Sequence, residues 1–221
     1  MDERELMALG QLLAERICGT NEAFCMELLR LLGHGRPVSA AQMGVALGMS
    51  EVAVTETFQR LPDIERDEMG QVVGWGLSLQ PTPHQFRING HTLYTWCALD
   101  ALTYPILLEQ TAQVESICPI TQTPIRLRVG PEGISTLDPA TAMVSLTIPD
   151  THPDACNRAS FCDQGHFFAS PEAAATWQAD HPEARALPVE AVYQLGRIIA
   201  TRRHHLSTRQ SPAVHTQEGH S

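Results

Sequence analysis

The stretch FRINGHTLYTWCALD, residues 86–100, predicts the centre of the fold. Asn89-Gly90 is a strong signal for a two-residue hairpin turn, so we expect residues 91–94 to return as the partner of the strand before the turn. A run with helical character follows directly, and we expect Pro105 to kink or end that helix. The stretch therefore predicts a β-hairpin that leads straight into a helix.

Cys97 and Asp100 lie three residues apart in this run, and side chains at that spacing share one face of a helix. A thiolate is a soft ligand and a nucleophile, whereas a carboxylic acid can carry a proton. The simplest alternative is that Cys97 is an inert buried side chain, as free cysteines often are. A carboxyl neighbour would be costly in such a core, which favours the chemical interpretation.

The composition excludes several other chemistries. The chain has 221 residues with 43% hydrophobic content, which is ample for a packed core, and its formal net charge is -10. Every basic residue is arginine, so a Schiff-base lysine and the lysine of a phosphate-binding loop are both excluded. The acidic balance also makes nucleic acid a poor partner.

We expect a cytoplasmic protein with free thiols. The charged start, residues 1–5, is not followed by an apolar run of signal-peptide length, and no stretch approaches the length of a membrane span. Thiols stay reduced in the cytoplasm, so disulfides are not expected. The six cysteines are Cys18, Cys25, Cys97, Cys118, Cys156 and Cys162.

The predicted fold class is α+β, with a helical winged-helix-like N-terminal domain over residues 1–80. Helical periodicity, with Ser39 and Ser50 as capping residues, predicts short helices, and a hairpin over residues 64–77 follows them. A mixed or antiparallel sheet core with flanking helices should occupy residues 84–201. Residues 202–221 should form a disordered tail.

Within the core, patterns of apolar residues predict several further elements. Strands are expected over residues 112–117, 125–129, 141–148 and 166–169. Ser170-Pro171 should start a helix that runs through Trp177, and a last helix should span about residues 189–200.

The winged-helix pattern alone suggests a regulator that reads DNA and senses metal through its thiols. The helix that would enter the groove carries Glu51 and Glu56 against Arg60, and the hairpin that would form the wing is also mainly acidic. Phosphate contact requires the opposite charge. We therefore prefer a structural or covering role for this unit and keep the regulator as the alternative.

Two other thiol sites deserve comparison. A structural zinc site could use Cys97, Cys118, Cys162 and His166, but such sites usually contain cysteines only two to four residues apart, and this chain has none. A cysteine nucleophile could pair with His91 or His166, although nothing local marks either histidine as a base. The histidines of the tail could bind metal weakly.

Two motifs resemble the alkylmercury (organomercurial) lyase family. The first is Leu93-Tyr94-Thr95-Trp96-Cys97-Ala98-Leu99-Asp100, and the second combines Ser160-Phe161-Cys162 with His166-Phe167-Phe168. Weaker similarity runs from about Leu28 to the last helix. The two motifs at this separation form a specific signal, whereas either alone would only be suggestive.

The resemblance implies a catalytic set of Cys97, Asp100 and Cys162, which also holds the metal. It implies protonolysis: one cysteine takes the organomercurial, its proton passes by way of Asp100, and Asp100 protonates the leaving carbon while both thiolates hold mercury. Cys118 would be structural. Some relatives carry a second cysteine where this chain has Asp163, so an auxiliary thiol is absent there.

The resemblance also implies the reaction partners. The substrate would be an alkyl- or arylmercury compound, and the products a hydrocarbon and bound Hg(II). No cofactor would be required, small thiols would assist release, and Hg(II) would pass to a mercuric reductase. The protein would act as a monomer or homodimer without nucleic acid or membrane. Aromatic walls for a dry site could come from Trp96, Phe161, Phe167 and Phe168, and the alternative is that these side chains belong to the ordinary core.

Overall fold

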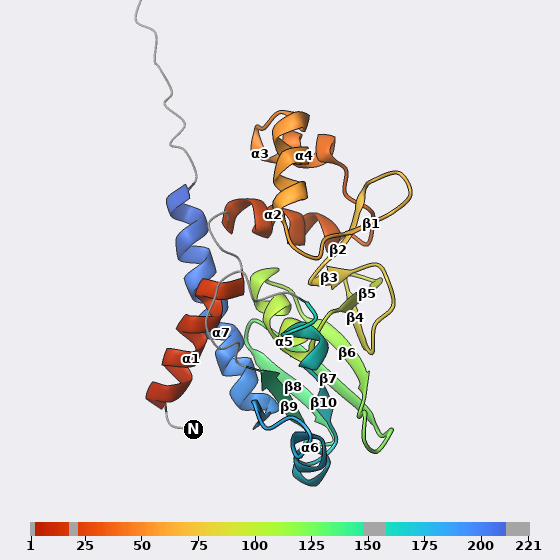
Figure 1. Ribbon diagram of the computed structural model, residues 1–221, viewed down its shortest axis with the longest axis vertical. Helices are drawn as coiled ribbons and strands as arrows, with labels where there is room; N and C mark the ends of the chain where they lie inside the picture. Colours follow the sequence, from red (N-terminus) through yellow and green to blue (C-terminus); the bar gives the residue numbers. More distant parts are fainter. Residues whose placement is uncertain (1–2, 18–21, 148–157, 211–221) are drawn as a thin grey trace, which may run out of the picture.

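The computed structural model describes residues 3–17, 22–147 and 158–210, arranged as in Figure 1. Cys18 and Cys156 lie outside these ranges. The helices are α1 (Glu3–Ile17), α2 (Glu22–Leu32), α3 (Ala40–Leu47), α4 (Glu51–Arg60), α5 (Ala98–Leu107), the short η2 (Cys162–Gln164), α6 (Pro171–Gln178) and α7 (Val189–Gln210). The strands are β1 (Glu65–Arg66), β2 (Val72–Trp75), β3 (Leu77–Ser78), β4 (His84–Ile88), β5 (His91–Thr95), β6 (Ala112–Ile117), β7 (Pro124–Gly130), β8 (Gly133–Asp138), β9 (Met143–Thr147), β10 (Phe167–Phe168) and β11 (Ala184–Pro188).

The predicted caps of the N-terminal helices are confirmed. Ser39 Oγ accepts from the amide of Gln42 at 3.2 Å, and the Gln42 side chain accepts from the amide of Ser39 at 2.8 Å. Ser50 Oγ accepts from the amide of Ala53 at 3.2 Å at the start of α4. These bonds satisfy amides that a helix leaves without partners at its N-terminus.

The expected hairpin forms, but its second strand is shorter than predicted. β1 pairs with β2, and Gly76, with φ +73°, then turns the chain so that β3 pairs back on β2. β3 also pairs with β5 through Leu77 and Thr95. The prediction of one continuous strand over residues 72–77 was wrong because glycine adopts this backbone conformation readily.

One antiparallel sheet runs through both halves of the protein. Its strand order is β1-β2-β3-β5-β4-β6-β7-β8. The predicted β4–β5 hairpin is confirmed, with φ values of +50° at Asn89 and +78° at Gly90. The sheet includes strands on both sides of residues 81–83, which separate the two predicted domains, so these domains share it. Their boundary stays a prediction.

A second, three-stranded sheet has the order β10-β9-β11. The expected strands over residues 141–148 and 166–169 are present as β9 and β10, and α6 begins as predicted, with Ser170 as its cap and Pro171 in its first turn. The sequence did not predict β8 or β11, whose burial patterns lack a regular alternation. The α+β class is confirmed.

α5 differs from its prediction at both ends. It begins at Ala98, so Cys97 is its N-cap with extended backbone angles. It continues past Pro105 to Leu107, and the amide of Leu108 bonds to the carbonyl of Tyr104 at 2.8 Å. A proline near the end of a helix removes one hydrogen bond, and the following amides continue the pattern here.

Helix α7 extends well beyond the expected Ala200, to Gln210, so the prediction of a disordered tail was wrong for residues 202–210, and its remainder, residues 211–221, lies outside the described residues. Arg203 is 3% exposed and its Nε donates to Glu22 Oε1 of α2 at 2.5 Å, which gives α7 a buried anchor. α7 also lies beside α1 and contacts α5 (Figure 1). No helix of the described segments is long and apolar enough to cross a membrane.

The Glu22–Arg203 pair generates a stability prediction. Glu22→Gln should lower the free energy of unfolding by about 3 kcal/mol, because it removes the charge that forms an ion pair with a buried guanidinium. Glu27→Gln is the control: it breaks the more exposed Arg30–Glu27 pair, and we expect a loss below about 1 kcal/mol. Chemical denaturation of both variants measures the difference, and equal losses would contradict the assignment.

Candidate active site

The structure brings the three predicted site residues together. The sulfur atoms of Cys97 and Cys162 and a carboxylate oxygen of Asp100 all lie within 4.8 Å of one another. Cys97 and Asp100 come from the start of α5, whereas Cys162 comes from η2, far along the chain. Among the described residues, no other cluster of three or more histidine, cysteine or carboxylate groups is this compact.

Cys97 occupies the N-terminus of α5 and not its interior. Its sulfur accepts from the amide of Asp100 at 3.4 Å, and its carbonyl accepts from the Thr95 hydroxyl at 3.0 Å. Burial raises the pKa of the Cys97 thiol well above its ordinary value, and the Cys162 thiol and the Asp100 carboxylate raise it further. Cys97 therefore stays protonated near neutral pH until a metal displaces its proton.

Asp100 is a buried acid poised near neutrality. Burial raises its pKa to about 6, against the lowering effects of the Cys97 thiol, the Tyr104 hydroxyl and Arg203. Its Oδ2 is buried and has no hydrogen-bond partner among the described residues. Such an orphaned oxygen can accept a proton, and an acid of this pKa can release it again.

Tyr104 is a site residue that the sequence reasoning missed. It lines the same cavity as Asp100, and burial raises the pKa of its hydroxyl well above the ordinary range. A Cβ atom at Gly76 would lie 1.8 Å from this hydroxyl, so glycine is required there. Nothing in the sequence connects Gly76 with Tyr104, which lies 28 residues further along the chain.

Cys162 reaches Cys97 through a close backbone contact. The carbonyl of Gly165 accepts from the amide of Ala98 at 2.9 Å, and a Cβ atom at Gly165 would lie 2.7 Å from the Cβ of Cys97. The Cys97 thiol lowers the pKa of Cys162, but burial and nearby carboxylates together raise it above its ordinary value. Only glycine at position 165 lets the two segments meet.

A small cavity of about 60 Å³ opens onto the two reactive groups Asp100 and Cys162. Trp96 and Phe161 line it, as predicted, whereas Phe167 and Phe168 are fully buried and do not. For these two phenylalanines the alternative, an ordinary place in the core, is confirmed, because β10 places them against β9. The cavity lining consists of Pro62, Asp63, Trp75, Gly76, Trp96, Asp100, Tyr104, Arg158, Phe161 and Cys162.

The cavity at the cysteines is not the largest in the structure. A hollow of about 550 Å³ lies between α2 and the end of α5, and its lining contains no cysteine. It brings together Glu27, Arg30, His34 and Glu109 without a compact ligand cluster. The donor set, and not the volume, therefore assigns the site.

The alternative thiol sites do not assemble in the described residues. Cys118 is buried in the β6–β7 turn, where its sulfur accepts from the amide of Thr121 at 3.5 Å, and it is not part of the cluster. His166 packs edge-on against Trp177 and also lies outside the cluster. Cys25 is buried in the core, as predicted. The proposed zinc site of Cys97, Cys118, Cys162 and His166 is therefore not formed.

Comparisons with known proteins agree over both halves of the chain. Residues 7–76 match a family model described as the helix-turn-helix domain of alkylmercury lyase, and residues 77–201 match the alkylmercury lyase model. A relative from Streptomyces lividans, an alkylmercury lyase, is 47% identical over 170 residues, which is 77% of this chain and 78% of the relative. Another from Pseudomonas putida is 48% identical over 173 residues, or 78% and 81% of the two chains.

A solved structure shows the same fold. The crystal structure of the mercury-bound form of MerB2 superimposes with a TM-score of 0.72 and 25% identity. The match covers 91% of this chain and 100% of the other.

The raised pKa of Asp100 generates a prediction about stability and pH. The pKa of Asp100 is about 6 in the folded protein and near 3.8 in the unfolded chain. The folded protein therefore loses stability as the pH rises from about 3.8 to about 6, because the folded state keeps its proton to a higher pH than the unfolded state does. At pH 7.5 the free energy of unfolding of Asp100→Asn should therefore exceed that of the wild type by up to about 3 kcal/mol. Chemical denaturation at several pH values measures this difference. The advantage should vanish near pH 3.5, and a constant difference across this range would contradict it.

Proposed function

Because the chain belongs to the alkylmercury lyase family, we propose that it cleaves carbon–mercury bonds by protonolysis at Cys97, Asp100 and Cys162. One observation supports the assignment of the reaction to these three residues. Two sulfur atoms and a carboxylate oxygen lie within 4.8 Å of one another beside a small cavity, so one mercury atom can contact both sulfurs while the acid reaches its carbon.

The two thiols supply affinity and electron density. Thiolates are soft ligands that favour a soft metal over hard cations, which gives selectivity for mercury. The carbon–mercury bond is nearly apolar, so its cleavage needs electron density at the metal and a proton at carbon. A thiol that binds mercury gives up its proton, and Cys97 lies next to Asp100, which can accept it.

Asp100 then delivers the proton to carbon. In total, an organomercurial with a leaving group and two thiols gives a hydrocarbon, a mercury bis-thiolate and the protonated leaving group, so all atoms balance. With a pKa of about 6, Asp100 is mostly ionised at neutral pH before the thiol releases its proton, and it is still acidic enough to donate it. Its carboxyl group therefore acts first as base and then as acid.

The organic group of a bound substrate would keep water away from this proton transfer. The cavity volume of about 60 Å³ compares with about 30 Å³ for each liquid water, so a small organic group would replace roughly two waters. Trp96 and Phe161 provide apolar walls for that group. A proton held by Asp100 in such a site has few acceptors other than the carbon.

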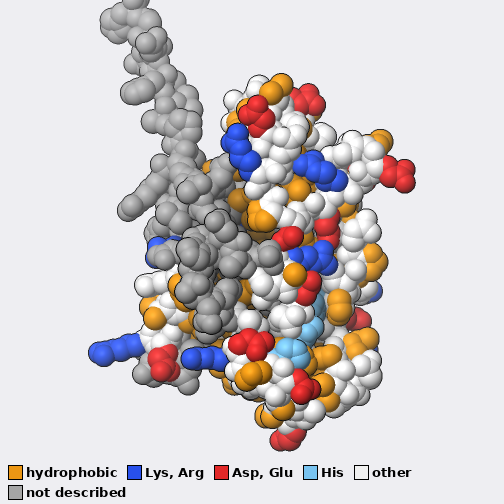
Figure 2. Space-filling model, in the orientation of Figure 1, with side chains coloured by type: hydrophobic (Ala, Val, Ile, Leu, Met, Phe, Trp, Pro, Cys, Tyr) orange, Lys and Arg blue, Asp and Glu red, His pale blue; other side chains and the backbone are white. Residues whose placement is uncertain are grey.

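We propose that the N-terminal unit has no role in binding nucleic acid. α4 exposes Glu51 and Glu56, and the Glu56 carboxylate lies 3.8 Å from Arg60, whose charge it partly offsets. Figure 2 shows acidic side chains at the tip of the wing and a mixture of both charges over the rest of this face. Phosphate binding would be opposed by this surface.

The cellular setting follows from the chemistry as a further proposal. The thiols have to be reduced to bind mercury, which suits the cytoplasm. The reaction needs no resident cofactor, since the protein supplies both ligands and the proton. Bound Hg(II) would leave by exchange with small thiols and pass to a mercuric reductase, because other thiols are the ligands best able to compete with two cysteines.

Hydrocarbon release tests the activity. Wild-type protein with methylmercury and excess thiol should release methane, detected by gas chromatography of the headspace. Cys97→Ser should release none above background, whereas Cys118→Ser, which removes a thiol outside the cluster, should keep its turnover per folded molecule and lose stability. No methane from the wild type would refute the proposed function.

The role of Asp100 has a separate test. Asp100→Asn should still bind Hg(II) with both thiols but should release hydrocarbon at least about 10²-fold more slowly, as expected for the loss of a general acid. Mercury retention and methane production would be measured on the same sample. Unchanged turnover in this variant would remove Asp100 from the mechanism.

A further inference from the structure

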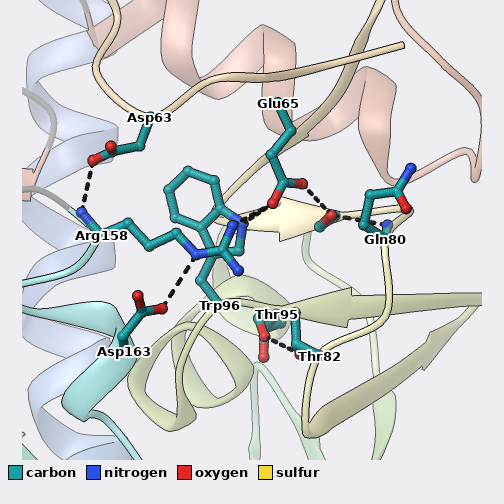
Figure 3. A network of polar contacts seen from close by, with 9 residues as sticks. Asp63, Glu65, Gln80, Thr82, Thr95, Trp96, Arg158 and Asp163 are labelled. Carbon is teal, nitrogen blue, oxygen red and sulfur yellow. Dashed lines mark hydrogen bonds and ion pairs between the residues drawn. The ribbon is translucent and has the colours of Figure 1, made fainter.

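Arg158 touches the neighbours of both reactive cysteines. Its guanidinium lies over the ring of Trp96, 4.9 Å from the centroid, and its Nε is 3.2 Å from Asp163 Oδ1. Trp96 directly precedes Cys97, and Asp163 directly follows Cys162. One side chain therefore links the two segments that carry the sulfur atoms (Figure 3).

The same arginine is anchored to the N-terminal unit. Its guanidinium forms an ion pair with Glu65 of β1, and its backbone amide donates to Asp63 Oδ2 at 2.7 Å. The indole of Trp96 donates to Glu65 Oε1 at 3.2 Å, so Glu65 holds both members of the stacked pair. Figure 3 shows the guanidinium lying between Glu65 and Asp163 and across the indole.

Glu65 is itself fixed in place. Its other carboxylate oxygen accepts from the hydroxyl of Ser78, which in turn accepts from the amide of Gln80 at 2.9 Å. A Cβ atom at Gly74, the residue paired with Glu65 in the sheet, would lie 1.9 Å from the Glu65 carboxylate. The glycine thus leaves the space in which Glu65 turns toward the site.

We propose that Arg158 is a positioning residue that holds Cys162 within bridging distance of Cys97, with Glu65 of the N-terminal unit as its fixed anchor. This inference rests on the proposed function and gives the winged-helix-like unit a part in it. The unit supplies the carboxylates that orient Arg158, and Arg158 aligns the two thiols.

The expected effect follows from chelation. Once one thiolate holds mercury, the second binds at an effective concentration set by how well it is placed. If Arg158 is lost, Cys162 samples more positions, and a small competing thiol removes Hg(II) more easily. Cleavage slows as well, because it requires both sulfurs on mercury, whereas the first encounter with substrate needs only one.

Competition for Hg(II) alone measures this directly. Each protein is loaded with one Hg(II), and the glutathione concentration that removes half of it is determined for the folded fraction. Wild type and Cys162→Ser set the two-thiol and one-thiol limits. In Arg158→Gln this glutathione concentration should be at least about tenfold lower than in the wild type, closer to the one-thiol limit. Arg30→Gln, which breaks an ion pair remote from the cluster, should stay at the wild-type value.

A second variant tests the anchor. Glu65→Gln keeps the shape of the side chain but removes the charge, and it should shift the glutathione midpoint in the same direction. The Arg158→Gln/Glu65→Gln double variant should be no worse than Arg158→Gln, because the amide oxygen introduced by Glu65→Gln can still accept from the Trp96 indole, and the ion pair with Arg158 is the contact that both variants remove. Additive losses, or single variants at the wild-type midpoint, would overturn the proposal.

Turnover supplies a readout that a loss of stability alone would not produce. Arg158→Gln should lower kcat at least about tenfold with little change in KM for methylmercury, since the two thiols are needed together only for cleavage. An equal kcat per folded molecule would overturn the inference. A wild type that retains Hg(II) but releases no hydrocarbon would refute the proposed function and leave the glutathione comparison valid.

Discussion

A hydrogen bond between two backbone groups, from the amide of Ala98 to the carbonyl of Gly165, joins the segments on which this site depends. It places the start of α5 against η2, and the glycine at position 165 removes the Cβ atom that would collide with Cys97. The sheet, α7 and the N-terminal unit all serve to hold these segments in register. Without that contact, Cys97 and Asp100 would form a helix cap with no second thiol.

The burial of the site residues also lowers the stability of the folded protein. Two thiols and a carboxyl group share a small space, and burial raises the pKa of Asp100 to about 6, so ionisation of this carboxyl group at neutral pH costs more in the folded state than in the unfolded state. Strongly shifted groups of this kind are typical of functional sites, where stability is given up for chemistry. The buried Glu22–Arg203 pair lies in the same region, and Arg203 moderates the shift of Asp100.

Sequence reasoning succeeded wherever the signal was local. The caps at Ser39 and Ser50 and the turn at Asn89-Gly90 depend on neighbours within a few residues, and all three were predicted. The family motifs supplied Cys97, Asp100 and Cys162, and the cluster confirms that they meet, while their separate roles stay proposals.

Contacts made only by the folded chain could not be predicted. Tyr104 and Arg158 gain their places through Gly76 and Glu65, which are distant in sequence. The length of α7 was underestimated because the partner of Arg203 lies in α2. Cys97 was placed inside a helix and not at its cap, since the sequence does not mark where β5 ends and α5 begins.

The continuous sheet has a consequence for how such a protein can evolve. β2, in the part matched by the helix-turn-helix model, pairs with β3, and β3 pairs with β5, the strand that leads into Cys97, so one sheet joins the two matched regions. A chain without β3 would leave β5 with an unprotected edge beside α5, a hazard for aggregation. The two parts of the chain therefore cannot be exchanged independently of each other without exposing an edge of the sheet.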